Sequence, residues 1–315
     1  MSFLLLIIGF FLLIKGADLF VEGAASIARK FNVPAMVIGL TIVAMGTSAP
    51  EAAVSITSSL AGQNDMSVAN IVGSNFFNIL VVLGVSSIIA KLPVEKNTIK
   101  KDAPFLLLVS ALLLLFGLNL NINRIEGLVL LVVFTYFLIS TVKSAKKISQ
   151  ETINEAATTM DIEVSKESSI PKTILISIIG IVGIVLGGDI VVDSATNIAT
   201  SFGMSANLVG LTIVAVGTSL PEFVTSIIAI KKGETEIAIG NVIGSNIFNI
   251  LLVLGLAATI SPITLSSLAL IDIIFMVSIT VLLYFFMKKD NSLVKSQGII
   301  FLIVYVAYMS YTIIR

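Results

Sequence analysis

The sequence predicts an all-α membrane protein in which ten transmembrane helices form two five-helix repeats of inverted topology. Three observations lead to this prediction. Hydrophobic residues make up 57% of the 315 residues and charged residues only 12%, so the chain is too apolar for a soluble domain of this size. The apolar residues fall into ten stretches, and the second half of the chain repeats the first without a gap.

The predicted spans are apolar stretches of the length that a bilayer requires. A membrane-crossing helix needs roughly 20 apolar residues. We place the ten spans at about 3–22, 34–61, 66–90, 103–120, 124–142, 172–196, 204–230, 236–260, 266–287 and 297–314. The rest of the chain consists of short connections, which leaves no room for a sizeable soluble domain.

The placement of lysine and arginine predicts the orientation of these spans. If the N-terminus faces outside, sixteen of the nineteen basic residues fall in the inner loops. Only Arg124 and Arg315 fall outside, and Lys15 lies within the first span. Cytoplasmic loops of membrane proteins carry such an excess of positive charge. We therefore predict a multi-pass protein of the cell membrane with both termini outside.

The two halves of the chain are related by a shift of 171 positions. At this shift residues 37–51 match residues 208–222, and residues 70–84 match residues 241–255, with 11 of 15 positions identical in each pair. The chain therefore contains one unit written twice.

The shift also defines the predicted domains. The first repeat covers residues 1–144, a cytoplasmic linker covers 145–171 and the second repeat covers 172–315. The linker mixes both signs of charge with small polar residues and could form one short amphipathic helix; we interpret it as a solvated tether rather than a regulatory element. Because each repeat holds five spans, an odd number, the second enters the membrane from the opposite side. Inverted repeats of this kind are typical of secondary transporters.

A polar motif interrupts the second span of each repeat, as GTSAPE at 46–51 and GTSLPE at 217–222. A proline inside a helix removes one N–H and clashes with the carbonyl four residues back. Pro50 is therefore predicted to release the carbonyl of Gly46 and to loosen that of Thr47. In a membrane such carbonyls need another helix, water or a cation as partner. An ordinary kink explains either motif taken alone.

The glutamates that end these motifs are harder to explain as structure. Glu51 follows Thr47 by four residues and Ser48 by three, so their oxygens share one helix face. The second motif repeats this arrangement with Thr218, Ser219 and Glu222. A charged carboxylate near the bilayer centre costs at least ~2.5 kcal/mol and faces a cavity or a partner. Two copies at matched depth indicate a site for a cation.

A second repeated motif, GSNFFN and GSNIFN, supplies further oxygens. Ser74 and Asn78 are four residues apart, as are Ser245 and Asn249, so each pair shares a helix face. One interpretation is that they bond neighbouring helices beside small glycines. The other places both pairs around the two glutamates, where inverted repeats meet at the midplane.

The assembled donors are all hard oxygens, which bind calcium, sodium or magnesium rather than softer transition metals. The chain has neither cysteine nor histidine, which excludes thiolate and imidazole ligands. Two carboxylates match the charge of one divalent ion. Magnesium is disfavoured because it gives up its waters reluctantly, whereas calcium accepts six to eight irregular oxygens.

Four more acids recur at the same shift, in the first span of each repeat: Asp18, Glu22, Asp189 and Asp193. They either line a permeation path or lie near the membrane face, where acids reach water. The sequence leaves both interpretations open.

Taken together, these motifs resemble those of the cation/calcium exchangers, and among them the sodium/calcium exchangers of prokaryotic type. The resemblance covers nearly the whole chain and rests on the paired Gly-Thr-Ser-x-Pro-Glu motifs, each followed by Gly-Ser-Asn-x-x-Asn. It implies ten helices in two inverted repeats, with the first and sixth spans sliding across a core to give alternating access. It also implies a transporter rather than an enzyme, with no cofactor.

The resemblance also implies the ligands of the transported ions. Calcium would be bound by the carboxylates of Glu51 and Glu222 and by the backbone carbonyls of Thr47 and Thr218. Sodium would use the same glutamates together with Ser48, Ser74, Ser219, Ser245 and the carbonyls of Ala44 and Ala215. Asn78 and Asn249 would face the middle of the site. Relatives that cotransport potassium carry aspartate at the position of Asn249, so exchange here is expected to be independent of potassium.

The predicted function is antiport in which inward sodium flow expels calcium, both ions competing for one set of oxygens. The implied partners are these two ions and the lipid bilayer, with neither nucleic acid nor a protein partner. A calcium/proton antiporter, with protons carried back on the glutamates, is the nearest alternative. A cation channel would also use carbonyls and carboxylates, although channels usually build a pore from several subunits.

Overall fold

In the computed structural model of the chain, residues 2–62, 64–158, 170–203 and 215–314 are described. The helices are α1 (Ser2–Lys30), α2 (Ala35–Ile38), α3 (Ala44–Thr47), α4 (Ala49–Leu60), α5 (Asn64–Phe76), α6 (Leu83–Ile89), α7 (Ala103–Gly117), α8 (Arg124–Thr158), α9 (Ile170–Ser201), α11 (Ala215–Gly217), α12 (Leu220–Lys231), α13 (Thr235–Phe248), α14 (Gly255–Ile260), α15 (Ser267–Asp290) and α16 (Lys295–Ile314). Wider π-helical turns connect several of them: η1 (Gly39–Val43), η2 (Phe77–Val82), η3 (Thr98–Asp102) and η5 (Asn249–Leu254). The chain is thus almost entirely helical, as predicted.

Six stretches of helix in the described residues are long and apolar enough to cross a bilayer: 2–30, 66–89, 124–147, 170–201, 235–260 and 267–290. The helices over 35–47 and 49–60 would make a seventh crossing, bent by 49° where they meet. The prediction of a multi-pass membrane protein is therefore confirmed in this coarser form. Helix α8 continues to Thr158, well into the predicted linker, and the first part of the predicted span 204–230 lies outside the described residues.

Two short antiparallel ladders join the halves of the chain. Strand β1 (Leu92–Pro93) pairs with β4 (Ser292–Leu293), and β2 (Asn121–Ile122) pairs with β3 (Ile263–Thr264). A shift of 171 residues carries β1 onto β3 and β2 onto β4. Each ladder therefore holds one strand from each half, and it ties together connections that the sequence predicts on one side of the membrane.

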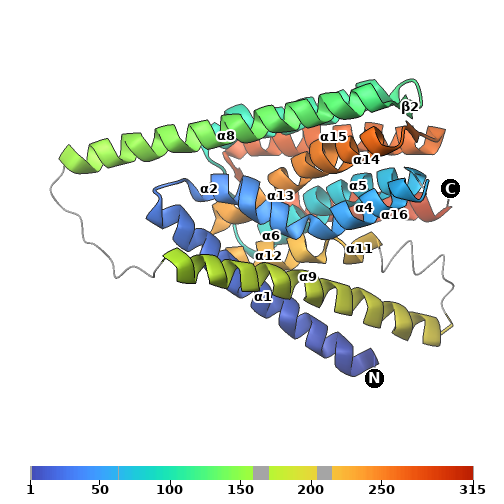
Figure 1. Cartoon of the computed structure of the whole chain (residues 1–315), viewed down its shortest axis with the longest axis horizontal. Helices are drawn as coiled ribbons and strands as arrows, with labels where there is room; N and C mark the ends of the chain where they lie inside the picture. Colours follow the sequence, from blue (N-terminus) through green and yellow to red (C-terminus); the bar gives the residue numbers. More distant parts are fainter. Residues whose placement is uncertain (1, 63, 159–169, 204–214, 315) are drawn as a thin grey trace.

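The helices form a bundle around a fully buried centre. Helix α13 is buried from Ile237 to Phe248, where its small residues let η1 and α3 pack closely against it. Helices α1 and α9 lie together along one side of the bundle, and α8 and α15 run along the opposite side (Figure 1). Outward-facing apolar residues such as Phe3 and Ile7 are more than 60% exposed. An apolar outer surface over a polar centre is the pattern expected of a protein solvated by lipid.

Glycines bring α1 and α9 into backbone contact. A Cβ added at Gly16 would lie 2.6 Å from the backbone nitrogen of Ile184, and one added at Gly180 would lie 2.7 Å from that of Phe20. No real Cβ approaches a backbone atom so closely, so both positions require glycine. Small residues allow membrane helices to pack in this way.

Candidate cation site

Two breaks in helices place the buried glutamates. The chain leaves helical geometry at Ser48 (φ −83°, ψ 9°), between α3 and α4, and again at Ser219 (φ −90°, ψ 5°), between α11 and α12. Pro50 and Pro221 lie in the first turn of the helix that follows each break. A missing N–H costs little there, because first-turn amides have no intrahelical partner. The predicted proline kink is thus a complete break two residues before each proline.

The first break lies against the α1–α9 pair. A Cβ at Gly46 would approach the ring of Phe20 on α1 to 3.2 Å and the side chain of Ile181 on α9 to 3.3 Å. These distances are tighter than ordinary contacts, so glycine is favoured here for its size. A movement of α1 or α9 would consequently change the packing against Gly46 at the break.

Glu51 and Glu222 lie in the first turn of the helices that follow the breaks, α4 and α12, and both are fully buried. The first turn is the positive end of a helix, which favours a carboxylate. In the described part of the chain no lysine or arginine forms a salt bridge with either glutamate. Within these residues the two acids are therefore buried without a basic partner.

Serine hydroxyls reach these carboxylates crosswise between the halves. The Ser48 hydroxyl donates to Glu222 Oε1 at 2.9 Å, and the Ser219 hydroxyl donates to Glu51 Oε1 at 3.1 Å. Each glutamate also accepts from a serine of its own half, Ser74 to Glu51 at 3.2 Å and Ser245 to Glu222 at 3.4 Å. All four serines that were predicted as site residues thus meet the two glutamates.

Asparagines form the next layer of the cluster. Asn249 Nδ2 donates to Ser74 Oγ at 3.2 Å and to Asn75 Oδ1 at 3.1 Å. Asn78 Nδ2 donates to Asn246 Oδ1 at 3.2 Å. All of these side chains are buried. Asn249 therefore contacts the serine–glutamate cluster directly, whereas the hydrogen bond that Asn78 makes among the described residues goes to another amide.

Four acceptor oxygens in this cluster have no hydrogen-bond donor among the described residues: Oε2 of Glu51, Oε2 of Glu222, Oδ1 of Asn78 and Oδ1 of Asn249. A buried acceptor without a partner carries its full desolvation penalty. A cation bound among these oxygens would remove that penalty. Carboxylate and amide oxygens are hard ligands, which bind calcium, sodium or magnesium rather than softer transition metals.

The remaining predicted residues lie beside the cluster. The shortest contact of Thr47 Oγ1 is with Asn241 Oδ1, at 3.0 Å, and its other contacts, with the carbonyls of Val43 and Ala44 and the hydroxyl of Ser245, are 3.2 to 3.5 Å long. Thr218 Oγ1 donates to Asn70 Oδ1 at 3.4 Å. The carbonyl of Ala44 accepts from the backbone N–H of Ser48 at 3.0 Å. Ala215 is the first residue of α11. The proposed use of their backbone carbonyls as ligands stays a prediction.

Sequence reasoning overlooked the other asparagines of this region, Asn70, Asn75, Asn241 and Asn246. A signal was present, because all four lie within the matched segments 70–84 and 241–255 and are identical in both halves. An uncharged amide at membrane depth is a weaker signal of function than a buried glutamate, because burying a carboxylate costs more free energy.

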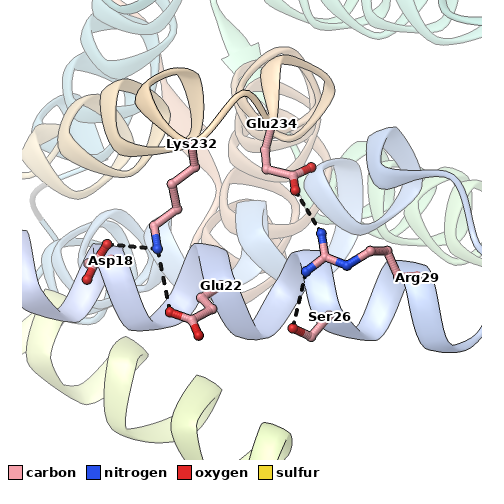
Figure 2. A network of polar contacts seen from close by, with 6 residues as sticks. All are labelled: Asp18, Glu22, Ser26, Arg29, Lys232 and Glu234. Atoms are coloured by element: carbon pink, nitrogen blue, oxygen red, sulfur yellow. Dashed lines mark hydrogen bonds and ion pairs between the residues drawn. The ribbon is translucent and has the colours of Figure 1, made fainter. Parts of the chain in front are cut away.

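The acids Asp18 and Glu22 lie away from this cluster, on α1. Lys232 Nζ lies 2.8 Å from Asp18 Oδ1 and 3.5 Å from Glu22 Oε2, and Arg29 Nη1 lies 3.0 Å from Glu234 Oε1 (Figure 2). Lys232 and Glu234 belong to the turn between α12 and α13. These partly exposed ion pairs thus fasten α1 to that turn. Asp189 and Asp193 are exposed on α9.

The same contacts keep the ammonium group of Lys232 protonated. Burial lowers the pKa of its ammonium group, but the hydrogen bond to Asp18 and the charges of Asp18 and Glu22 outweigh this effect and leave the pKa raised. The lysine therefore stays protonated through neutral pH.

We expect Lys232→Gln to lower the melting temperature of the purified protein by roughly 2 °C. Partly exposed ion pairs contribute up to about 1 kcal/mol, and a change of that size shifts the midpoint of a large domain by about 2 to 4 °C. Lys231→Gln is the matched control, since Lys231 is adjacent and exposed and pairs with no acid in the described ranges. Thermal unfolding in detergent measures both. Equal shifts in the two variants would show that the ion pairs with α1 contribute nothing.

Comparison with known proteins places this chain among ion exchangers. The family model described as "Sodium/calcium exchanger protein" matches residues 1–143 and 172–314. The chain is 43% identical to "Putative antiporter CaxA" of Alkalimonas amylolytica, over 81% of this chain and 80% of the relative. It is 30% identical to "Sodium/calcium exchanger MaX1" of Methanosarcina acetivorans, over 98% of this chain and 97% of the relative.

Solved structures agree with these matches. A structure of the sodium-calcium exchanger NCX_Mj, soaked with zero Na+ and Ca2+, superposes with a TM-score of 0.86 at 32% identity and covers 99% of this chain and 98% of its own. Another, soaked with 2.5 mM Na+ and 10 mM Sr2+, gives a TM-score of 0.85 at 34% identity, over 98% of this chain and 99% of its own.

Proposed function

The chain belongs to the sodium/calcium exchanger protein family and is a membrane antiporter, and on this premise we propose that it exchanges sodium for calcium. Inward flow of sodium would drive calcium out of the cell. The observation that carries this proposal is the pair of buried glutamates, each with one unpartnered carboxylate oxygen and no basic partner in the described part of the chain.

In this proposal the two ions share one set of oxygens. Calcium takes the carboxylates of Glu51 and Glu222 and the backbone carbonyls of Thr47 and Thr218. Sodium ions take the glutamates, the carbonyls of Ala44 and Ala215 and the hydroxyls of Ser48, Ser74, Ser219 and Ser245. The hydrogen bonds between these serines and the glutamates support the assignment, because they show the hydroxyls already gathered around the acids.

Sharing of the site couples the two flows. A carboxylate pair without cations is costly to hold inside a bilayer. The empty site therefore crosses rarely, and each ion returns only in exchange for the other. Asn249 and Asn78 add carbonyl oxygens but no charge, so the site keeps a charge of −2, which one calcium ion matches without potassium.

The proposed architecture is ten spans in two inverted repeats, covering residues 1–144 and 172–315, with both termini outside the cell. Two observations support it. The two segments that match the family model are offset by 171 residues, since 172 − 1 = 314 − 143 = 171. The strand ladders exchange partners between the halves under the same shift. Alternating access would move α1 and α9 against the rest of the bundle.

The decisive experiment measures calcium-45 flux in vesicles containing the purified protein, with sodium, proton and potassium gradients imposed separately. We expect calcium movement to follow the sodium gradient alone. Calcium movement driven by protons in sodium-free vesicles would instead indicate a calcium/proton antiporter. Calcium movement with no counterflow of a second ion would indicate a channel and contradict the proposal.

The crosswise serines give a further prediction. Ser48→Ala and Ser219→Ala each remove a hydroxyl that donates to a buried carboxylate, a bond that contributes about 1.5 to 3 kcal/mol. We expect the half-saturating sodium concentration for exchange to rise roughly tenfold in either variant. Ser310→Ala is a suitable control, because Ser310 is exposed on α16 and its hydroxyl bonds only to the carbonyl of Val306 in the described structure. Unchanged sodium dependence in both serine variants would remove these hydroxyls from the proposed site.

A further inference from the structure

Two asparagines that lie outside the set of proposed ligands make the same contacts in each half. Asn241 Nδ2 donates to the backbone carbonyl of Glu222 at 3.4 Å and to Ser226 Oγ at 3.1 Å. Its Oδ1 accepts from Thr47 of the other half at 3.0 Å. Asn70 makes the matching bonds with Glu51, Ser55 and Thr218, at 3.3, 2.9 and 3.4 Å.

We infer that Asn70 and Asn241 are positioning residues of the cation site, each fastening the glutamate-bearing helix of one half to the helix break of the other. The inference rests on the proposed function, because the site that they position is the proposed exchange site. Neither side chain contacts a carboxylate oxygen in the described structure, so they act on the ligands through other residues.

The chemistry of the contacts fixes which end of each amide faces which partner. A backbone carbonyl can only accept a hydrogen bond, so the NH₂ group of Asn241 must face the carbonyl of Glu222. Its oxygen is then left for the hydroxyl of Thr47, which can donate. The same reasoning orients Asn70 between Glu51 and Thr218. An acidic side chain of similar size would lose the donated bond, and an aliphatic one would lose both connections.

These bonds close a ring around each glutamate. Asn241 holds the backbone of Glu222 and the side chain of Thr47, while the next residue, Ser48, donates to the carboxylate of Glu222. Backbone and carboxylate of one glutamate are thus fixed to two consecutive residues at the opposite break. The matching ring contains Asn70, Glu51, Thr218 and Ser219.

The rings explain how ligands from opposite halves stay in register. Thr47 and Ser48 stand at a break, where no continuous helix holds them in place. Binding groups must be held within about 0.5 Å of their productive positions by neighbouring hydrogen bonds. Buried Asn241 and half-buried Asn70 supply such bonds between elements that are far apart in the sequence.

A double-mutant cycle tests this inference. Thr47→Val removes the hydroxyl but keeps the branched shape and the backbone carbonyl, and Asn241→Ala removes its partner. We expect each to raise the half-saturating calcium concentration roughly tenfold, since a buried group is left unpaired. The double variant should also bind calcium only about tenfold more weakly than the unaltered protein, because the effects of substituting two residues in contact are not additive. Equilibrium calcium binding to the purified protein provides the measurement.

The crosswise geometry provides the matched control. In the described structure Thr47 bonds to Asn241 and not to Asn70. The effects of Thr47→Val and Asn70→Ala on the half-saturating calcium concentration should therefore multiply to roughly a hundredfold increase. Thr47→Ser keeps the hydroxyl and should therefore weaken calcium binding less than Thr47→Val does. A residue that only stabilised the fold would lower the yield or the melting temperature without moving calcium affinity in this crossed pattern.

The outcomes separate the inference from the proposed function. Multiplying effects in the Thr47–Asn241 pair, or unchanged calcium affinity in both single variants, would overturn the inference while the exchange site stands. Absence of calcium binding to the unaltered protein would overturn both. If the asparagine variants do not fold, the comparison of Thr47→Val with Thr47→Ser decides, and equal affinities for these two would overturn the inference.

Discussion

Replacement of either buried glutamate by glutamine, as Glu51→Gln or Glu222→Gln, is expected to abolish sodium-driven calcium flux while the protein still inserts in the membrane. Each change keeps the size of the side chain and removes half of the charge that balances a divalent ion. Removing one partner of a buried charge pair costs about 3 to 5 kcal/mol, which corresponds to roughly 100- to 4000-fold weaker calcium binding. Flux should therefore fall to the level of vesicles without protein.

The control for this experiment is Glu126→Gln. Glu126 lies in the first turn of α8, where its carboxylate accepts from the backbone N–H of Asn123, a bond that an amide oxygen can also accept. Its flux should match that of the unaltered protein. Insertion of all variants is checked by yield and by thermal unfolding in detergent. Near-normal calcium flux in Glu51→Gln or Glu222→Gln would falsify the assignment of the site.

Exchange by the unaltered protein is expected to be unchanged when choline replaces potassium on both sides of the membrane, whereas Asn249→Asp is expected to slow it severely. The described cluster has two acids, and Asn249 brings an uncharged amide to Ser74 and Asn75. An aspartate there would add a third charge, so a single calcium ion would no longer balance the site. It would also turn an acceptor toward Asn75 Oδ1, where the present amide donates.

The charge effect has a distinct dependence on pH. Protonation of the new acid restores the original charge, so the ratio of variant to unaltered flux should rise as the pH falls. Asn249→Ala is the matched control, because it removes the same hydrogen bonds without adding a charge, and its ratio should not change with pH. Loss of most flux in the unaltered protein when potassium is absent would contradict the charge argument.

Much of the fold and of the cluster could be predicted because the repeat removes ambiguity. A single buried glutamate beside a proline is compatible with an ordinary helix kink and an acidic residue that has no function. Two at the same depth, Glu51 and Glu222, indicate a shared centre, and the structure gathers the serines of both motif pairs around them. The helical, multi-pass character followed from composition and length alone.

The partners within the cluster could not be predicted, because they depend on the geometry of the breaks. Helical spacing places Ser48 on the face of Glu51, its neighbour in sequence. The chain leaves helical torsions at Ser48 itself, and its hydroxyl bonds to Glu222 of the other half instead. Spacing rules hold within one helix and give no information across a break. The ion pairs of Asp18 and Glu22 with Lys232 could not be predicted either, because they join residues distant in the sequence.

The crosswise bonds also bear on how the protein is made. Ser219, which donates to Glu51, lies 168 residues further along the chain. At roughly 5 to 20 residues per second, a ribosome needs about 8 to 34 s to add that stretch. During this interval the newly inserted Glu51 lacks a hydrogen bond that it has in the finished fold, at a membrane depth where a poorly solvated carboxyl group is costly. This bond of Glu51 can therefore form only after Ser219 has left the ribosome.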